Sequence, residues 1–372
     1  MKTLCKSIAL ISILISGASQ AEVVLNGFAN IVAGMTSSSD EELYDFDDSL
    51  DFETGSLLAI QASSDLGNGL GVTAQIMSRG VDNWEANFEW AFVSYDATDN
   101  LRFLLGKQRV PFYMYSDYLD VSYAYPWITP PEGVYSVAFD TFEGLGAIYS
   151  DEFVGFDTTI QVIYGSNTED ISLGEGPVEP DFKDLMGLAV TVNKNWLTLR
   201  AAYLQSDMNA PFFDGLANGW NLAGFPDIAD NIAIESDTGK FVEFGFQLDF
   251  DNFIAVGEFT RLTLDGTTLA NQDSYFILGG YKISDLLIHV TYGADENERD
   301  NFASNAPSIP GLSVPTQGLI ASQQRESNYT TVGARWDFHP SAALKLEYTD
   351  FSDDTNSSRD AGLFRTAIVT VF

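Results

Sequence analysis

The feature that most constrains the fold is an alternation of apolar and polar residues with a period of two. In FVEFGFQLDF, residues 241–250, every second side chain is apolar and most of those between are polar. VGFDTTIQVIY, residues 154–164, repeats the pattern. Because successive residues of a strand point to opposite faces, such segments form strands with one apolar and one largely polar face. The chain is therefore predicted to be all-β.

The lengths of the joins between strands indicate which kind of β protein this is. Sixteen strands are predicted, beginning near residues 23, 53, 70, 85, 100, 141, 154, 183, 196, 239, 252, 274, 286, 325, 343 and 361. Joins after even-numbered strands are short, as at DN (251–252), and most joins after odd-numbered strands are long, as at 109–140. The strands of a soluble β-sandwich also alternate apolar and polar residues, but nothing in that fold requires short joins and long joins to alternate along the chain. Outer-membrane barrels combine an even strand number with short periplasmic turns and long external loops. We therefore predict a transmembrane antiparallel β-barrel.

Residues 1–21 have the three parts of a secretory signal peptide. Lys2 and Lys6 are followed by an apolar core and by the small-x-small sequence Ser19-Gln20-Ala21. The apolar core is shorter than the roughly 20 residues that a membrane-spanning helix needs; the alternative is a buried N-terminal helix. The predicted barrel domain is then 22–372. Cys5, the only cysteine, is removed with the signal, which excludes thiolate metal sites and cysteine nucleophiles.

The charge balance is strongly acidic, with 53 Asp and Glu against 18 Lys and Arg and a net charge of −35 at pH 7. Such a surface repels nucleic acid and attracts cations. Acidic chains are often disordered, but 13% aromatic and 45% hydrophobic residues exclude this. The acidic segments 40–48 and 295–300 could bind divalent cations weakly, although their spacing matches no calcium loop. Solvated loops are the simpler interpretation, and no metal or cofactor is predicted.

The chain ends on an apolar strand, RTAIVTVF, residues 365–372. A terminal strand that pairs with the first closes a barrel, so that no unpaired edge faces lipid. Aromatic residues beside the short turns are predicted to lie at the membrane interface, where outer-membrane barrels carry aromatic girdles; the alternative is that they are ordinary core residues. These are Trp196, Phe250, Phe253, Trp336, Phe338 and Phe372.

Three segments, in this order, resemble the Gram-negative general porins: SSDLGNGLGVTAQ (63–75), DNLRFLLGKQRVPF (99–112) and NYTTVGARWDFHPSAALKLEY (328–348). The resemblance implies a sixteen-stranded outer-membrane barrel, in contact with lipid and lipopolysaccharide, that passes small hydrophilic solutes and ions by diffusion. It also implies a homotrimer and a third loop folded into the lumen. Phe372 resembles the terminal aromatic residue read by the barrel-assembly machinery. The chain departs from the family in its short second external join, 80–84, which leaves the trimer contacts open, and in lacking the acidic, glycine-bearing tip of the third loop.

The predicted third loop, from Val110 to Asp140, contains four acids, no Lys or Arg, and many tyrosines. The resemblance places it against the inner wall. Alternation along the strands places five basic side chains on the inner face, opposite to the apolar side chains that face lipid. A charge on the lipid face would cost about 2–4 kcal/mol at the bilayer midplane. The alternative is that some of these side chains lie at strand ends and extend to the membrane interface. These bases are Arg79, Arg102, Arg200, Arg335 and Lys345. The predicted constriction sets Asp117, Asp120 and Glu132 against Arg79, Arg102 and Arg200. A weak to moderate cation preference follows from the acidic mouth.

Three other functions remain open. In a substrate-specific channel, the tyrosines of the third loop would form a stacking path for one class of solute. An outer-membrane hydrolase would use His289, but it would need a partner nucleophile or acid, and a lone histidine is more often a structural hydrogen bonder. In a non-conducting adhesin or phage receptor, only the external loops would matter. A passive porin without enzymatic activity is the prediction.

Overall fold

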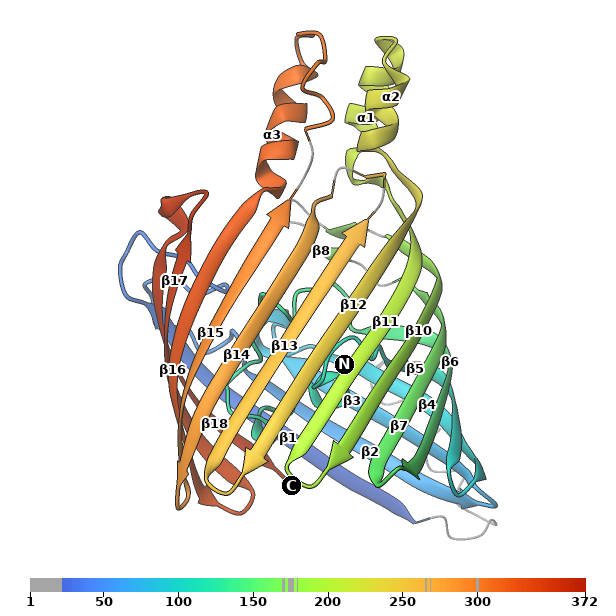
Figure 1. Cartoon of the computed structure of the whole chain (residues 1–372), viewed down its shortest axis with the longest axis vertical. Coiled ribbons are helices and arrows are strands. Elements are labelled where there is room, and N and C mark those ends of the chain that lie inside the picture. The colour runs from blue at the N-terminus through green and yellow to red at the C-terminus, as the bar shows by residue number, and fades with distance from the viewer. Residues whose placement is uncertain are drawn as a thin grey trace, which may run out of the picture.

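The computed structural model describes residues 22–168, 171–172, 177–178, 180–264, 266–267, 269–298 and 301–372. Within them, sixteen antiparallel strands form a closed barrel (Figure 1). The strands are β1 (Val23–Thr36), β2 (Leu57–Gly67), β3 (Leu70–Arg79), β4 (Ala86–Thr98), β5 (Leu101–Arg109), β6 (Thr141–Phe153), β7 (Phe156–Asn167), β10 (Asp181–Lys194), β11 (Leu197–Ala210), β12 (Ile234–Phe250), β13 (Phe253–Leu264), β14 (Asn271–Ile283), β15 (Leu286–Glu298), β16 (Arg325–His339), β17 (Ala342–Asp353) and β18 (Ala361–Val371). A separate ribbon pairs β8 (Ile171–Ser172) with β9 (Pro177–Val178). The predicted signal peptide lies outside the described residues.

All sixteen predicted strands are present, and the largest differences are at two strand starts. β12 begins at Ile234 rather than near residue 239, because it stays paired with β11 up to Ala210, beyond the predicted end of the alternation. β2 begins at Leu57 rather than near residue 53. The predicted asymmetry of the joins is confirmed and gives the barrel a short-turn end and a long-loop end.

The short turns use residues that tolerate a left-handed backbone. Asn195 has φ 55° between β10 and β11, and Asp251 has φ 54° between β12 and β13. Short polar side chains tolerate this conformation because they can hydrogen-bond the local backbone. The turn residues thus fix where each hairpin reverses.

The two faces of the wall differ as the alternation predicts. In β12, Phe244 is exposed on the outer face whereas Glu243 is fully buried inside. The six aromatic residues predicted beside the short turns are between 46% and 65% exposed. Among the described residues, no helix is long and apolar enough to cross a bilayer.

β18 closes the barrel by pairing with β1, from Phe28 opposite Val371 to Thr36 opposite Leu363. Beyond this ladder, the backbone N–H of Phe372 donates to the carbonyl of Gly27 at 2.9 Å, and the N–H of Gly27 donates back at 2.8 Å. A Cβ at Gly27 would lie 2.5 Å from the Phe372 ring. The closing strand therefore depends on a glycine that leaves space for the terminal aromatic ring.

Two long loops carry helices that the sequence analysis did not predict. The join 211–233 forms α1 (Asp214–Leu222) and α2 (Pro226–Ile232), and the join 299–324 contains α3 (Ser313–Gln323). These helices rise above the barrel (Figure 1). α1 and α2 share a small apolar core around Trp220 with the segment 302–312, which precedes α3. The indole N–H of Trp220 donates to the Thr316 hydroxyl at 2.7 Å.

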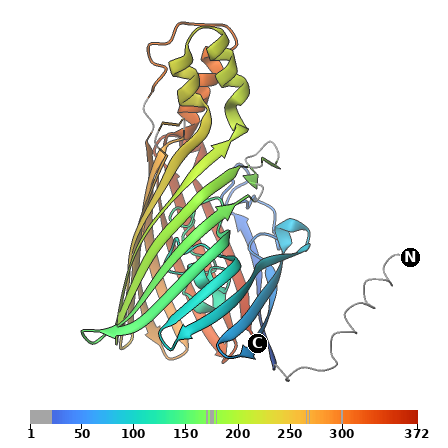
Figure 2. The same cartoon turned by 90° about the vertical axis from the view of Figure 1, so that its right-hand side faces the viewer.

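The barrel wall opposite the helices is lower, since β5 has 9 residues and β12 has 17 (Figure 2).

Candidate functional site

The third loop, residues 110–140, runs inside the barrel and contacts strands far away in the sequence. The indole N–H of Trp127 donates to the hydroxyl of Thr291 in β15 at 2.8 Å. The Tyr123 hydroxyl donates to the carbonyl of Pro340, at the turn between β16 and β17, at 2.9 Å. The loop therefore crosses the lumen, as the resemblance implied.

Apolar side chains fix one side of the loop to the wall. The ring of Phe112 packs 4.9 Å from that of Phe241 in β12, and the ring of Trp127 packs 5.2 Å from that of Phe276 in β14. They belong to one buried cluster of loop and wall residues. This part of the lumen is filled by packed side chains, although the inner face of a water-filled porin is usually polar.

Inward-pointing bases hold the backbone of the loop. The Lys345 ammonium is fully buried and donates to the Ser122 hydroxyl at 3.0 Å and to the carbonyl of Tyr125 at 2.9 Å. It also contacts the carbonyls of Ser122 and Trp127. Arg335 donates to the carbonyls of Tyr123 and Tyr125 at 2.8 and 2.9 Å. Both bases point inward as predicted, but they bind loop carbonyl groups instead of facing water.

Arg200 in β11 has the same function at the start of the loop. Its guanidinium donates to the carbonyl of Pro111 at 2.7 Å and to the carboxylate of Glu243 at 2.7 Å. Acidic wall residues hold the loop through its donors: Glu258 accepts from the N–H of Met114 at 3.0 Å, and Glu347 accepts from the N–H of Ile128 at 2.9 Å. Charged hydrogen bonds of this kind are stronger than neutral ones.

The opposite side of the loop ends in a cluster of five charged groups. Arg79 lies 3.2 Å from Asp120 and 3.0 Å from Glu89, and Arg109 lies 3.1 Å from Glu89. Arg109 also pairs with Asp120 and Asp140. Oxygens of the three carboxylates lie within 4.8 Å of one another, close enough to hold a metal ion. Two guanidinium groups already neutralise most of this charge, which favours an ionic network over a metal site.

Sequence reasoning missed Glu89 and Arg109. The register between β3 and β4 shifts so that Gln75 opposes Trp90 and Ile76 opposes Phe88, which leaves Glu89 as the extra residue of a β-bulge. Strand parity cannot place a bulged residue. Arg109 would face outward by parity with Leu105, but it is the last residue of β5, where the chain turns into the lumen. Pro111, two residues later, indicates that the strand ends near this point.

The environment shifts the pKa values of the loop carboxyl groups in different directions. Burial opposes ionisation of Asp120, but the adjacent Arg109 and Arg79 guanidinium groups outweigh it and lower its pKa. Burial raises the pKa of Asp140 to about 6, against the attraction of Arg109. Desolvation by the surrounding protein also raises the pKa of Asp117, against Arg200 and Arg109, although its side chain is exposed to a cavity.

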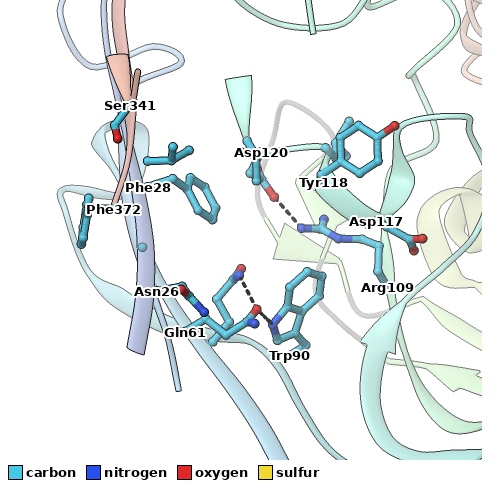
Figure 3. Close-up of a pocket in the computed structure, with 15 residues that line it drawn as sticks. Asn26, Phe28, Gln61, Trp90, Arg109, Asp117, Tyr118, Asp120, Ser341 and Phe372 are labelled. Atoms are coloured by element: carbon cyan, nitrogen blue, oxygen red, sulfur yellow. Dashed lines mark hydrogen bonds and ion pairs between the residues drawn. The ribbon is translucent and has the colours of Figure 1, made fainter. Parts of the chain in front are cut away.

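Cavities lie on both sides of the loop. A cavity of about 470 Å³ opens toward the short-turn end and is lined by Asp117, Asp120, Arg109 and the terminal Phe372 (Figure 3). On the side of the long loops lies a cavity of about 820 Å³, here called the vestibule. Five acids and two arginines line it: Asp40, Glu42, Asp45, Glu132, Asp295, Arg325 and Arg359.

The structure thus separates the predicted constriction residues. It brings Arg79 and Asp120 into contact and places Asp117 in the cavity beside them. Glu132 lies in the vestibule instead. Arg102 does not lie opposite the acids of the third loop: it pairs with Asp96 at 2.5 Å beside the short turn between β4 and β5. Parity gives a side chain's face but not its height along the barrel, which is why this prediction for Arg102 was wrong.

The positions of the third-loop tyrosines and of His289 do not support the substrate-specific channel or the hydrolase considered above. Tyr113, Tyr115 and Tyr125 are buried against one another and the wall, so they do not form an open stacking path. His289 is 1% exposed, and neither ring nitrogen has a hydrogen-bond partner among the described residues. It therefore lacks the orienting acid that a hydrolase would need, and it is not the hydrogen bonder that was expected.

Solved structures of low sequence identity share the fold. The outer-membrane channel DcaP of Acinetobacter baumannii is 14% identical, with a TM-score of 0.61 over 96% of this chain and 99% of that one. OmpF of Salmonella typhi, in complex with daunomycin, is 13% identical, with a TM-score of 0.61 over 95% and 98%. The trimer form of OmpT from Vibrio cholerae is 11% identical, with a TM-score of 0.56 over 95% and 100%.

No curated protein matches the sequence. A family model for Gram-negative porins matches residues 7–356, which is most of the chain. The closed sixteen-stranded barrel with a loop across its lumen agrees with that match. The chain belongs to the Gram-negative porin family and forms a passive channel in the outer membrane.

Proposed function

We propose that this porin prefers cations and that the third loop sets its conductance. The observation that carries the proposal is the unequal exposure of the lumenal charges. Arg109, Arg200 and Lys345 are each at least nine-tenths buried and bound to the loop, whereas Asp117 is exposed to the cavity on the short-turn side. The vestibule adds more acids than bases. A permeating ion therefore meets mainly negative charge, and rings of acidic side chains favour cations.

The test is the reversal potential of the purified protein in a planar bilayer under a salt gradient. The wild type is expected to prefer cations, and Asp117→Asn is expected to shift the reversal potential toward anions because it removes an exposed charge beside the pore path. Asp251→Asn is the matched control: Asp251 lies in a turn outside both cavities, and asparagine tolerates its φ of 54°. Anion preference of the wild type at low salt would overturn the proposal, as would equal shifts in the two variants.

We also propose that the mature protein starts at Glu22 and assembles as a homotrimer. The first proposal rests on the signal-peptide pattern of residues 1–21. The second is supported by the trimer form of OmpT, which has the same fold. N-terminal sequencing of the purified protein tests the first. Light scattering in detergent tests the second, with a monomer as the contradicting result.

We propose further that the protein is not an enzyme. His289, the residue considered for a hydrolase, is buried in the wall, and no acid of the described part of the chain hydrogen-bonds its ring. Conductance should be unchanged in His289→Ala. An esterase or protease activity that this variant loses would instead support an enzyme.

A further inference from the structure

The inner wall between β10 and β13 is apolar at its long-loop end. Phe182, Leu204, Phe241 and Leu264, one from each strand, are all at least nine-tenths buried on the inner face. The outer faces of the same strands are apolar as well, as at Leu188 and Phe244. A strand wall between lipid and a water-filled lumen usually alternates apolar-out and polar-in. This wall departs from that pattern where the third loop passes it.

The third loop covers this apolar wall only in part and leaves a cavity of about 270 Å³ between them. Five phenylalanines line the cavity: Phe112, Phe139, Phe182, Phe212 and Phe241. The rings of Phe139 and Phe182 lie 4.4 Å apart. Aliphatic side chains, including Met208 and Leu269, and the polar residues Gln205, Ser206 and Lys240 complete the lining. Lys240 precedes the inward-facing Phe241 in β12, so strand alternation points its ammonium group to the other face. An apolar cavity of roughly 150 Å³ can hold a benzene molecule, so this one has room for an aromatic ring with a short side chain.

The apolar cavity adjoins the acidic vestibule. Ser136 of the third loop and Gln272 of β14 line both. A molecule in the apolar cavity would have its outer end at this shared edge, beside a hydroxyl and an amide. Beyond the edge lie the five vestibule acids, including Glu132 and Asp295. That charge attracts a cationic end group and repels an anionic one.

We propose that this cavity is a binding site for small aromatic amines, with the ring between the third loop and the wall and the ammonium at the vestibule edge. A pocket lined by apolar and aromatic side chains with a few convergent polar groups is the usual form of a small-molecule site. The proposal extends the proposed function by giving the pore a preferred solute class. It does not depend on which ions the pore conducts.

Two glycines of the barrel allow a matched test. Gly239 in β12 lines the cavity, and a Cβ added there would meet nothing closer than 3.7 Å, so the backbone accommodates Gly239→Leu and the leucine side chain occupies part of the cavity. Gly279 in β14 has no atom within 4 Å of an added Cβ and lies between the exposed Ile277 and Tyr281. Gly279→Leu therefore adds the same group to the outer face.

The experiment is isothermal titration of the detergent-solubilised full chain with 2-phenylethylamine. Butylamine, which lacks the ring, and 3-phenylpropionate, which carries the opposite charge, are the comparison probes. We expect both comparison probes to bind at least tenfold more weakly. We expect Gly239→Leu to weaken binding of 2-phenylethylamine at least tenfold and Gly279→Leu to change it less than twofold.

Equal binding to the wild type and to Gly239→Leu would overturn the proposal, and so would equal binding of 3-phenylpropionate. If Gly239→Leu does not fold, as judged by heat-modifiable migration on gels, Leu269→Asn, between β13 and β14, replaces it with the same expected loss. Planar-bilayer conductance of the same samples separates the two proposals. A conducting protein that does not bind the amine overturns only the amine site, and a binding protein that does not conduct overturns only the channel.

Discussion

At the scale of single residues, the inward-facing bases stabilise the third loop. Burying an ammonium group is costly unless hydrogen-bond acceptors surround it. Lys345 meets this condition with the hydroxyl of Ser122 and carbonyl groups that include that of Tyr125. The loop carbonyl groups accept the hydrogen bonds that the buried ammonium group needs. In return, the ammonium group provides donors for loop carbonyl groups that have no partner in the sheet.

Replacing this lysine is expected to release the loop. Lys345→Met leaves several buried carbonyls without a donor, at about 1–3 kcal/mol for each unsatisfied group. We expect the free energy of unfolding to fall by at least about 2 kcal/mol in urea titrations followed by tryptophan fluorescence, and single-channel current to become noisier. Lys282→Met is the control, because Lys282 forms an exposed pair with Asp249 and such pairs contribute about 0–1 kcal/mol. Equal losses in the two variants would contradict this account.

Glu132 is expected to make the vestibule sensitive to pH. Burial raises the pKa of Glu132 to about 7, with Asp45 adding to the effect and Arg365 opposing it. The carboxyl group therefore gains its charge between about pH 6 and 8, and the cation preference should increase over that range. Reversal potentials measured at both pH values should differ more in the wild type than in Glu132→Gln, where Asp140, with a pKa of about 6, still titrates at the lower end of the range. A pH response of equal size in Glu132→Gln would assign the effect to another group.

The same shift affects stability with a defined sign. The native protein holds this proton more tightly than the unfolded chain, whose glutamates titrate near 4.5. The contribution of Glu132 to stability is therefore fully present below pH 4.5 and is lost as the pH rises through about 7. Urea midpoints of the wild type should fall relative to those of Glu132→Gln over this window.

At the scale of strands and loops, the sequence predicted what depends on local pattern. The sixteen strands and their short turns follow from alternation and turn residues, which act between neighbours in the chain. The bulge at Glu89 and the tethering of the loop by Arg335 depend on pairing with distant segments. No local pattern encodes those partners. For the same reason, parity found the inward face of Lys345 but not the carbonyls that it binds.

Closure of the barrel is expected to depend on the fit between Gly27 and Phe372. Gly27→Val places a side chain where the Phe372 ring lies, so β18 should pair poorly with β1. We expect less heat-modifiable barrel on gels and less protein in the outer membrane, with export across the inner membrane intact. Deletion of Phe372 should have the same effect. Gly279→Val is the control, since its Cβ meets nothing within 4 Å; normal assembly of the Gly27 variant would refute the role of this contact.

At the scale of the whole molecule, the net charge of −35 acts through long-range attraction of cations. The Debye length is about 30 Å at 0.01 M salt and about 3 Å at 1 M. The external loops, which lie far from the ion path, can therefore act on permeating ions mainly in dilute salt, whereas Asp117 acts at contact distance. The contribution of the external loops to cation preference should therefore depend strongly on ionic strength, and that of Asp117 only weakly.

We expect the cation preference to decrease as the mean salt concentration rises at a fixed gradient ratio. In Asp117→Asn, the preference that remains at low salt should vanish at about 1 M, where screening removes the contribution of the loops. Reversal potentials at 0.01 M and 1 M mean salt provide the measurement. A preference that is independent of salt would place the selectivity wholly at the narrowest part of the pore.

The attachments of the third loop also imply an order of folding. Its partners are separated from it by up to 236 residues, and they come from strands as far along the chain as β17 and β18. Contacts between such distant residues form late, because the chain entropy of closing the intervening segment must be overcome first. The wall should thus close before the loop is fastened. A late folding intermediate would then be a closed barrel whose lumen the third loop does not yet cross, and it should conduct more current than the native protein.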